Sequence, residues 1–131
     1  MENKIAGNRF ESELCQILAE HGWWAHNMSQ GKAGQPADII AVKNRVPVII
    51  DCKLCQNDRF VLSRIEPNQE NAMKLWQKKV GNNHCYFALK VSSGDIYMAS
   101  NEMLKLFRMA GMGTLGIAEI RKFPTLERWL A

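Results

Sequence analysis

The strongest constraint on the fold of this chain is a pair of short apolar segments, 38–42 and 46–53, separated only by Lys43-Asn44-Arg45. Short segments rich in β-branched residues around a tight polar connection predict a β-hairpin. In the second segment Val48, Ile49 and Ile50 are consecutive, so both faces of that strand are apolar. We therefore expect other elements to cover both faces of the sheet.

Helical and extended segments alternate along the rest of the chain. Apolar residues recur at helical spacing from Phe10 to Leu18, with Asn8 as the N-cap and Gly22 as the stop signal. The expected order is helix 9–21, strand 23–28, the hairpin, an irregular loop 55–65, helix 66–80, strands 84–91 and 95–99, and helix 101–109. The tail 116–131 is compatible with a strand followed by a helical turn. This order predicts an α/β fold, a mixed β-sheet flanked by helices.

Length and composition indicate a small globular protein. The chain has 131 residues, 47% hydrophobic and 23% charged, which predicts a single domain spanning residues 1–131. The longest apolar run, 46–50, is too short to cross a bilayer, and the N-terminus lacks the apolar core of a signal peptide. We therefore expect a cytoplasmic protein that does not associate with membranes, with its four cysteines as free thiols.

The charges and cysteines leave two questions open. Residues 1–66 hold eight basic and eight acidic side chains, whereas residues 67–131 hold nine basic and five acidic ones, giving a net charge of +4. This excess permits a polyanionic partner without requiring one. Cys52-x-x-Cys55 with His84-Cys85 is a weak zinc pattern, because structural zinc sites usually have two closely spaced ligand pairs. Buried thiols are the simpler interpretation.

Asp51-Cys52-Lys53 places charges at the end of an apolar strand. Side chains alternate along a strand, so Asp51 and Lys53 share one face and Cys52 lies on the other. An ion pair where the strand surfaces would explain these two charges alone. The hairpin, however, also brings Asp38 close to Asp51, although a turn aspartate would explain Asp38 alone. Two converging carboxylates favour a cation such as Mg²⁺ or Mn²⁺, beside which Lys53 could position or deprotonate a water.

Other polar residues lie where they could complete such a site. Glu11 falls near the edge of the apolar stripe of its helix, and Gln69 lies on the face that continues with Ala72 and Met73. A helix-start amide would also explain Gln69. Candidate phosphate contacts occur in the first helix, in the polar loop before Asp38 and in the second helix: Arg9, Ser29, Gln30, Lys32, Lys74 and Lys78.

Three segments occur in order along the chain: Gly7-Asn8-Arg9-Phe10-Glu11-Ser12-Glu13-Leu14, Gly34-Gln35-Pro36-Ala37-Asp38-Ile39-Ile40-Ala41 and Ile49-Ile50-Asp51-Cys52-Lys53. Together they resemble the PD-(D/E)XK nuclease superfamily, and within it the Holliday-junction resolvases of the archaeal and Gram-positive types. Glu66-Pro67-Asn68-Gln69 resembles the glutamine-bearing helix of the Gram-positive branch. The resemblance covers roughly residues 7–100, and the order and spacing are more specific than any single motif.

The resemblance implies a restriction-endonuclease-like core and Mg²⁺-dependent phosphodiester hydrolysis, leaving a 5′-phosphate and a 3′-hydroxyl. Mn²⁺ is the expected substitute. The resemblance assigns the metal site to Glu11, Asp38, Asp51 and the backbone carbonyl of Cys52. The catalytic set would be the three acids with Lys53 and Gln69. The resolvase branch further implies a homodimer that cuts branched DNA symmetrically.

Three departures from the family pattern leave the substrate open. Ala37 adds a residue between Pro36 and Asp38, the second acid is Asp rather than the commoner Glu, and segment 51–53 follows its partner strand too closely for the projecting stalk of Gram-positive resolvases. We favour an endonuclease acting on branched DNA. The alternatives are a restriction-like or nicking nuclease on ordinary duplex, and a catalytically silent nucleic-acid-binding module. The clustered acids argue against the silent module.

Overall fold

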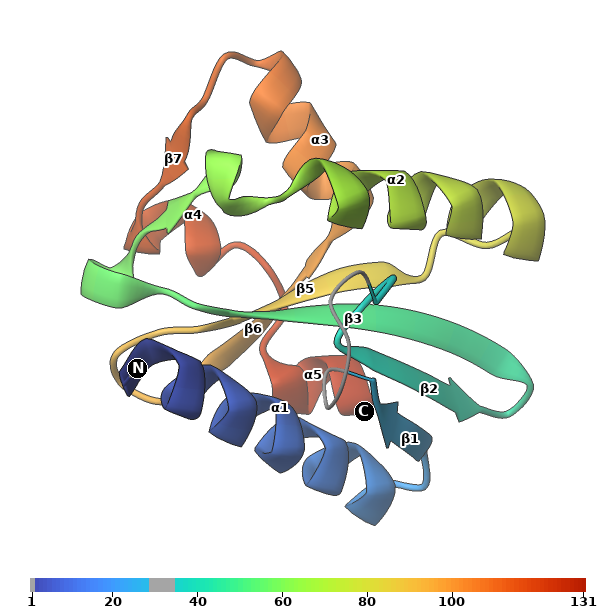
Figure 1. Cartoon of the computed structure of the whole chain (residues 1–131). Coiled ribbons are helices and arrows are strands. Elements are labelled where there is room, and N and C mark those ends of the chain that lie inside the picture. Colours follow the sequence, from blue (N-terminus) through green and yellow to red (C-terminus); the bar gives the residue numbers. More distant parts are fainter. Residues whose placement is uncertain (1, 29–34) are drawn as a thin grey trace.

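A five-stranded sheet forms the centre of the molecule (Figure 1). The computed structural model describes residues 2–28 and 35–131, with side chains from residue 5 onward. The strand order is β1-β2-β3-β5-β6. The strands are β1 (Trp24–Asn27), β2 (Ile39–Lys43), β3 (Val46–Leu54), β5 (Cys85–Lys90) and β6 (Ile96–Ser100).

The sheet is mixed, as the sequence predicts. β3 and β5 are parallel, with Ile50 opposite Tyr86, whereas the other neighbouring strands are antiparallel. The crossover between β3 and β5 contains helix α2 (Pro67–Leu75), which continues into a π-helical turn, Trp76–Val80. β2 and β3 are joined by a tight turn in which Asn44 (φ 51°) and Arg45 (φ 68°) are both left-handed. Such a turn fits the twist of a hairpin.

Helices cover both faces of the sheet (Figure 1). Helix α1 (Glu2–Glu20) and the short α5 (Leu126–Leu130) lie on one face, whereas α2, α3 (Asn101–Met109) and α4 (Ile117–Ile120) lie on the other. A two-stranded ribbon, β4 (Phe60–Val61) and β7 (Thr114–Leu115), lies beside α4. Two 3₁₀ turns, η1 (Gln56–Asp58) and η2 (Leu62–Arg64), flank β4.

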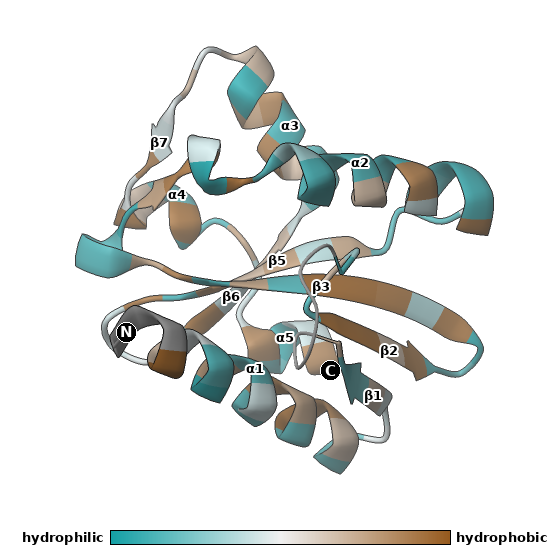
Figure 2. Cartoon of the chain, in the orientation of Figure 1, coloured by the Kyte–Doolittle hydropathy of each residue, from teal (hydrophilic) through white to brown (hydrophobic). Residues whose placement is uncertain are grey.

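Each face of the sheet has its own hydrophobic core, because β3 contributes alternate residues to the two sides. Ile49 packs with Phe60, Met73 and Phe87 on the α2 side. Ile50 packs with the α1 side, where Phe10, Leu14 and Leu18 are almost fully buried. Figure 2 shows the matching hydropathy, with apolar residues along β2 and β3 and hydrophilic residues on outward surfaces of the helices.

Three expected boundaries differ from the structure. The first helix begins at Glu2 rather than at residue 9, so Asn8 lies inside the helix and is not its N-cap. Asn8 is exposed, and asparagine in a helix costs only a few tenths of a kcal/mol, roughly 0.5, so it does not stop the helix. The segment 55–65 contains η1, β4 and η2 instead of being wholly irregular. In the tail, the strand precedes Gly116, and two short helices follow it.

Candidate active site

Two aspartates lie where β2 and β3 separate, directly after the Ile39–Ile50 pair of the hairpin. The backbone N–H of Asp38 donates to Asp51 Oδ1 at 3.2 Å, and the backbone N–H of Cys52 donates to Asp38 Oδ2 at 2.8 Å. Each carboxylate therefore accepts a hydrogen bond from the strand that carries the other. The hairpin brings the two acids together, as its sequence predicts.

Burial makes ionisation of these carboxyl groups unfavourable. Asp51 is only 1% exposed. Burial first, and the charge of Asp38 second, raise the pKa of Asp51 to about 7, although the Lys53 charge acts in the opposite direction. The pKa of Asp38 is also raised, mainly by burial, while the hydrogen bond from Cys52 counteracts part of this effect. A cation between the two groups would remove the repulsion.

Glu11 approaches this pair from the opposite layer. It lies on α1 between the buried Phe10 and Leu14, and it is 9% exposed. Its carboxyl group forms a side-chain hydrogen bond with Asp38, which lowers the pKa of Asp38. A hydrogen bond between two carboxyl groups requires a proton on one of them. The inward orientation expected for Glu11 is therefore present, whereas Glu13 lies outside and pairs with Lys90 at 3.2 Å.

Lys53 and Gln69 form a second contact between the layers. Lys53 Nζ donates to Gln69 Oε1 at 3.1 Å and to the backbone oxygen of Arg64 at 3.2 Å. Gln69 Oε1 also accepts from the backbone N–H of Glu66 at 3.1 Å, within the capping box that begins α2. Gln69 therefore connects the start of the helix to the lysine, which fixes the Lys53 ammonium on the side of β3 that carries Asp51.

The donor set fits a magnesium ion. Asp51 Oδ2 is buried and has no hydrogen-bond partner among the described residues, so it is an oxygen available to a cation. Within residues 5–28 and 35–131, no three His, Cys, Asp or Glu side chains form a complete metal-binding group. Mg²⁺ is usually held by one or two carboxylates, with waters completing its octahedron. Asp38 and Asp51 would satisfy that requirement, and the backbone carbonyl of Cys52 stays a predicted ligand.

The cysteines are in surroundings that disfavour the thiolate a zinc ion needs. Burial raises the pKa of the Cys55 thiol to about 11 and that of the Cys85 thiol to about 12. Burial, followed by the charge of Asp38, raises the pKa of the Cys52 thiol as well. These effects favour the buried-thiol interpretation of the sequence pattern.

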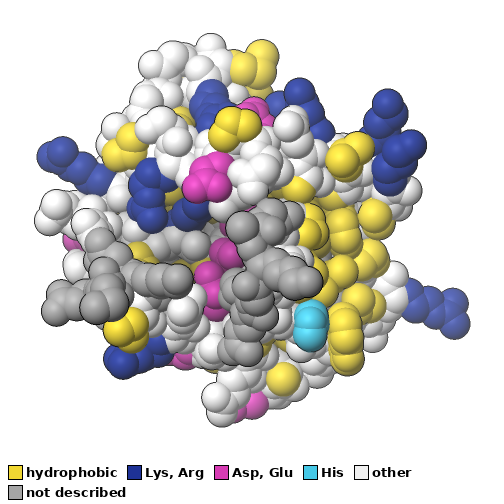
Figure 3. Space-filling model, in the orientation of Figure 1, with side chains coloured by type: hydrophobic (Ala, Val, Ile, Leu, Met, Phe, Trp, Pro, Cys, Tyr) yellow, Lys and Arg dark blue, Asp and Glu magenta, His cyan; other side chains and the backbone are white. Residues whose placement is uncertain are grey.

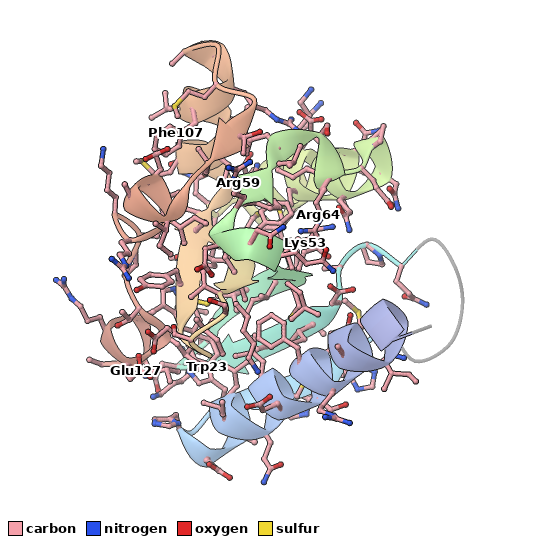
Figure 4. All side chains as sticks on the ribbon, turned by 90° about the vertical axis from the view of Figure 1, so that its left-hand side faces the viewer. Trp23, Lys53, Arg59, Arg64, Phe107 and Glu127 are labelled. Atoms are coloured by element: carbon pink, nitrogen blue, oxygen red, sulfur yellow. The ribbon has the colours of Figure 1, made fainter. Side chains whose placement is uncertain are left out.

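A cleft of about 470 Å³ lies beside the acids, and sequence reasoning did not identify it. Gly7 of α1 lines it together with Cys52 and Leu54 of β3, and the chain after β3 adds Gln56, Asn57, Arg59, Val61 and Arg64. Figure 4 labels Lys53, Arg59 and Arg64 in the same region of the molecule, above α1. Figure 3 shows Lys and Arg side chains gathered next to acidic ones on this face. The available sequence signal was two arginines in the polar segment directly after the acid-bearing strand.

The predicted phosphate contacts have different outcomes. Arg9, Lys74 and Lys78 are exposed, as a DNA contact requires. Arg9 precedes Glu11 by two residues, or about 200° around the helix, so it points away from the acids. Ser29, Gln30 and Lys32 lie outside the described residues, and their role stays a prediction.

No described helix is both long enough and apolar enough to span a bilayer.

Comparison with known proteins identifies the family. No curated protein matches the chain in sequence. The solved structure of Hjc from Archaeoglobus fulgidus, a Holliday junction resolvase, matches with a TM-score of 0.72 at 18% identity, covering 95% of this chain and 100% of that chain. This likeness supports the α/β fold with its mixed sheet. The family model of the archaeal Holliday junction resolvases (Hjc) matches residues 2–117. Because that match covers most of the sequence, the chain belongs to the archaeal Holliday junction resolvase family.

Proposed function

We propose that this resolvase hydrolyses phosphodiester bonds in four-way DNA junctions with Mg²⁺ at the Asp38–Asp51 pair. The observation that carries the proposal is the buried Asp51 Oδ2 without a described hydrogen-bond partner, next to a second carboxylate and on the same face of β3 as Lys53. A structural ion pair would have used that oxygen. A protein that only binds DNA gains nothing from buried acids, because they repel phosphate.

Asp38, Asp51 and the backbone carbonyl of Cys52 would hold the metal, with Glu11 restraining Asp38 through their hydrogen bond. When bound, Mg²⁺ lowers the pKa of a coordinated water and offsets negative charge on the phosphate. Mn²⁺ also prefers oxygen ligands and is the expected substitute. This cation requirement follows from the chemistry of the donor set and from the family.

Lys53 supplies the positive charge of the site. Its ammonium is held by Gln69 and by the Arg64 carbonyl, both neutral acceptors, so its charge is directed to the site without a carboxylate partner among its hydrogen bonds. There it would orient the attacking water and stabilise the charge that develops on the phosphate. Gln69 acts as a positioning residue, because it fixes Lys53 through one oxygen.

Resolution of a four-way junction needs two cuts, and we propose that two copies of the chain supply them. An apolar groove of about 740 Å³ lies between the sheet and α2, and its walls include Ile40, Pro36, Trp76 and the exposed Leu75 and Val80. Apolar side chains are continuous over this part of the surface in Figure 3. The groove includes Pro36, two residues before Asp38, and Asn68, which directly precedes Gln69. A second copy bound there would pair two active sites, and we propose that the dimer acts on DNA in the cytoplasm.

A direct test compares a labelled four-way junction with linear duplex of the same sequence, each incubated with the protein in Mg²⁺ and in EDTA. The proposal predicts paired cuts in the junction, in Mg²⁺ only, with product ends carrying a 5′-phosphate. Equal cutting of both substrates would instead establish a nuclease that acts on ordinary duplex. Junction binding without cutting in Mg²⁺ or Mn²⁺ would contradict the proposed activity.

A further inference from the structure

The cleft beside the acids combines cationic and amide side chains over an apolar floor. Arg59 and Arg64 lie on its rim with Gln56 and Asn57, and no Asp or Glu is among its lining residues. Its volume of about 470 Å³ is within the range of small-molecule sites and is large enough for a nucleotide. This chemistry fits a phosphate and the sugar attached to it.

The cleft borders the proposed catalytic site, although its β3 residues, Cys52 and Leu54, lie on the face of the strand opposite to Asp51 and Lys53. Cys52 lines the cleft, and its backbone N–H donates to the Asp38 carboxylate. Leu54, which also lines the cleft, lies three residues beyond Asp51, or about 10 Å along an extended strand. A DNA strand that binds at the acids and turns around this end of β3 would reach the cleft with a neighbouring nucleotide.

The two arginines are presented differently. Arg64 is fixed, because its Nη1 donates to the Leu54 backbone oxygen at 2.6 Å and its guanidinium lies 5.8 Å from the centre of the Phe60 ring. Arg59 is exposed and forms no ion pair with a described residue. A guanidinium without a carboxylate partner on the rim of a cleft is available to bind an anion.

The turn directly before Arg59 has a strained backbone and is held by hydrogen bonds to Asp58. Asn57 (φ 56°) and Asp58 (φ 54°) are both left-handed, a conformation that is uncommon outside glycine. Asp58 is held by Ser92, which donates to its carboxylate from the backbone N–H at 2.8 Å and from the hydroxyl at 2.9 Å. Strain maintained by specific hydrogen bonds often marks a functional position.

We propose that this cleft is a phosphate-binding site for the DNA backbone next to the cleaved bond, with Arg59 and Arg64 as its anion-binding groups. The Asp58–Ser92 contact positions Arg59. The inference rests on the proposed nuclease function and deepens it, because it states which side of the acids the cut strand follows.

Binding to labelled junction in EDTA, measured across a salt series, tests the arginine directly. Arg59→Ala is expected to weaken binding about tenfold and to reduce the slope of log affinity against log salt by about 1, the value for one lost phosphate contact. Arg128→Gln removes a charge from the exposed surface of α5 and serves as the control, with little change expected. Equal effects of the two variants would overturn the site.

Two further variants separate the cleft from general charge effects. A Cβ at Gly7 would meet no atom within 4 Å, so Gly7→Trp can fill the cleft without disturbing the core. It should reduce cleavage about tenfold, whereas Asn8→Trp, one position around the helix, should not.

Asp58→Ala removes a negative charge, and this change alone would strengthen DNA binding. Loss of the Asp58–Ser92 contact is nevertheless expected to weaken DNA binding, because Arg59 is no longer positioned. Stronger binding by Asp58→Ala would contradict the positioning role.

The same experiments distinguish failure of this inference from failure of the proposed function. If the wild-type protein cuts junctions but Arg59→Ala and Gly7→Trp behave like their controls, the nuclease stands and the cleft is wrong. If the wild-type protein cuts no DNA while Arg59→Ala still loses affinity and salt slope, the cleft stands as a DNA contact and the nuclease is wrong.

Discussion

Asp51 carries a buried charge that disfavours folding at neutral pH and that the proposed cation would offset. Its carboxyl group is almost fully buried and accepts one hydrogen bond. Burial and the charge of Asp38 raise its pKa to about 7, because both disfavour the ionised form. An unfolded Asp has a pKa of about 3.9. The folded state thus binds the proton more tightly, so this group stabilises the fold at low pH and loses that contribution as pH rises through about 7.

The first prediction follows from that sign. Asp51→Asn removes the buried charge, so the metal-free variant should have a Tm roughly 5 °C or more above wild type at pH 8 and a clearly smaller excess at pH 5. Thermal unfolding in EDTA at the two pH values measures this. Glu127→Gln, which neutralises an exposed acid on α5, is the control and should leave Tm unchanged. An equal Tm for wild type and Asp51→Asn at pH 8 would contradict the buried-charge account.

The second prediction concerns competition between proton and cation. Because Asp51 is partly protonated near pH 7, the Mg²⁺ concentration needed to stabilise the protein should be several-fold higher at pH 6 than at pH 8. Thermal shift titrations with MgCl₂ at both pH values give the midpoints, and Asp51→Asn should lose most of the response. A wild-type midpoint that does not depend on pH would place the cation elsewhere.

At the residue scale, sequence reasoning found the acids because their proximity depends on one hairpin with a local signal. Asp38 and Asp51 come together through the Ile39–Ile50 pair, and the turn at Asn44-Arg45 fixes that register. Arg59 and Arg64 were missed because their position depends on how residues 56–64 fold back toward α1, which no local pattern predicts.

At the scale of elements, α2 does two things through its first turn. Glu66 and Gln69 form the capping box that begins the helix, and the same Gln69 oxygen holds Lys53. The sequence predicted this helix from Glu66-Pro67, and Gln69 alone was open between a cap and a site residue. In the structure its Oε1 accepts both the capping hydrogen bond from Glu66 and the one from Lys53, since a carbonyl oxygen has two lone pairs to share.

The third prediction separates these roles. Gln69→Ala and Glu66→Ala each break the capping box and should each lower stability by about 1 kcal/mol. Only Gln69→Ala also releases Lys53, so its cleavage rate should fall about tenfold or more while Glu66→Ala stays within about threefold of wild type. Single-turnover cleavage with denaturant unfolding measures both effects. Equal cleavage by the two variants would show that Gln69 is only a cap.

Helix α1 shows where prediction of elements reaches its limit. Its buried face was evident from the spacing of Phe10, Leu14 and Leu18, and Gly22 ends it with a φ of 85°. Its start was misplaced by seven residues, because Asn8 is as acceptable within an exposed helical turn as it is at a cap. The two 3₁₀ turns around β4 were equally invisible, since each is only three residues long and is held by the ribbon with β7.

At the scale of the molecule, the two cores lie on either side of the sheet, and the proposed active site lies where the central strands β2 and β3 separate. Figure 3 shows acidic side chains, Lys and Arg side chains and a continuous apolar area on one face of the molecule. The mixed sheet between helical layers was predictable because apolar runs, helical spacing and turn residues agree. The relative position of the cleft and the groove was not, because it depends on the crossover through α2.

The fourth prediction tests that groove. Leu75→Glu places a charge on its wall and should convert a dimer of twice the 14.9 kDa chain mass into monomers. Leu106→Glu is a matched control, because Leu106 on α3 is 57% exposed and Leu75 is 56% exposed. Size-exclusion chromatography with light scattering distinguishes the states. A wild-type monomer, or a dimer that survives Leu75→Glu but not Leu106→Glu, would reject this interface.

The most direct test of the central claim is a comparison of junction cleavage and junction binding for wild type and Asp51→Asn in Mg²⁺. The account predicts that the variant loses at least a thousandfold in cleavage rate, because the cation and the attacking water lose their anchor. Its junction affinity in EDTA should be equal or higher, since a negative charge has left the DNA-binding face. Cleavage by the Asp51→Asn variant at a rate near that of wild type would contradict the assignment of this acid pair as the catalytic centre.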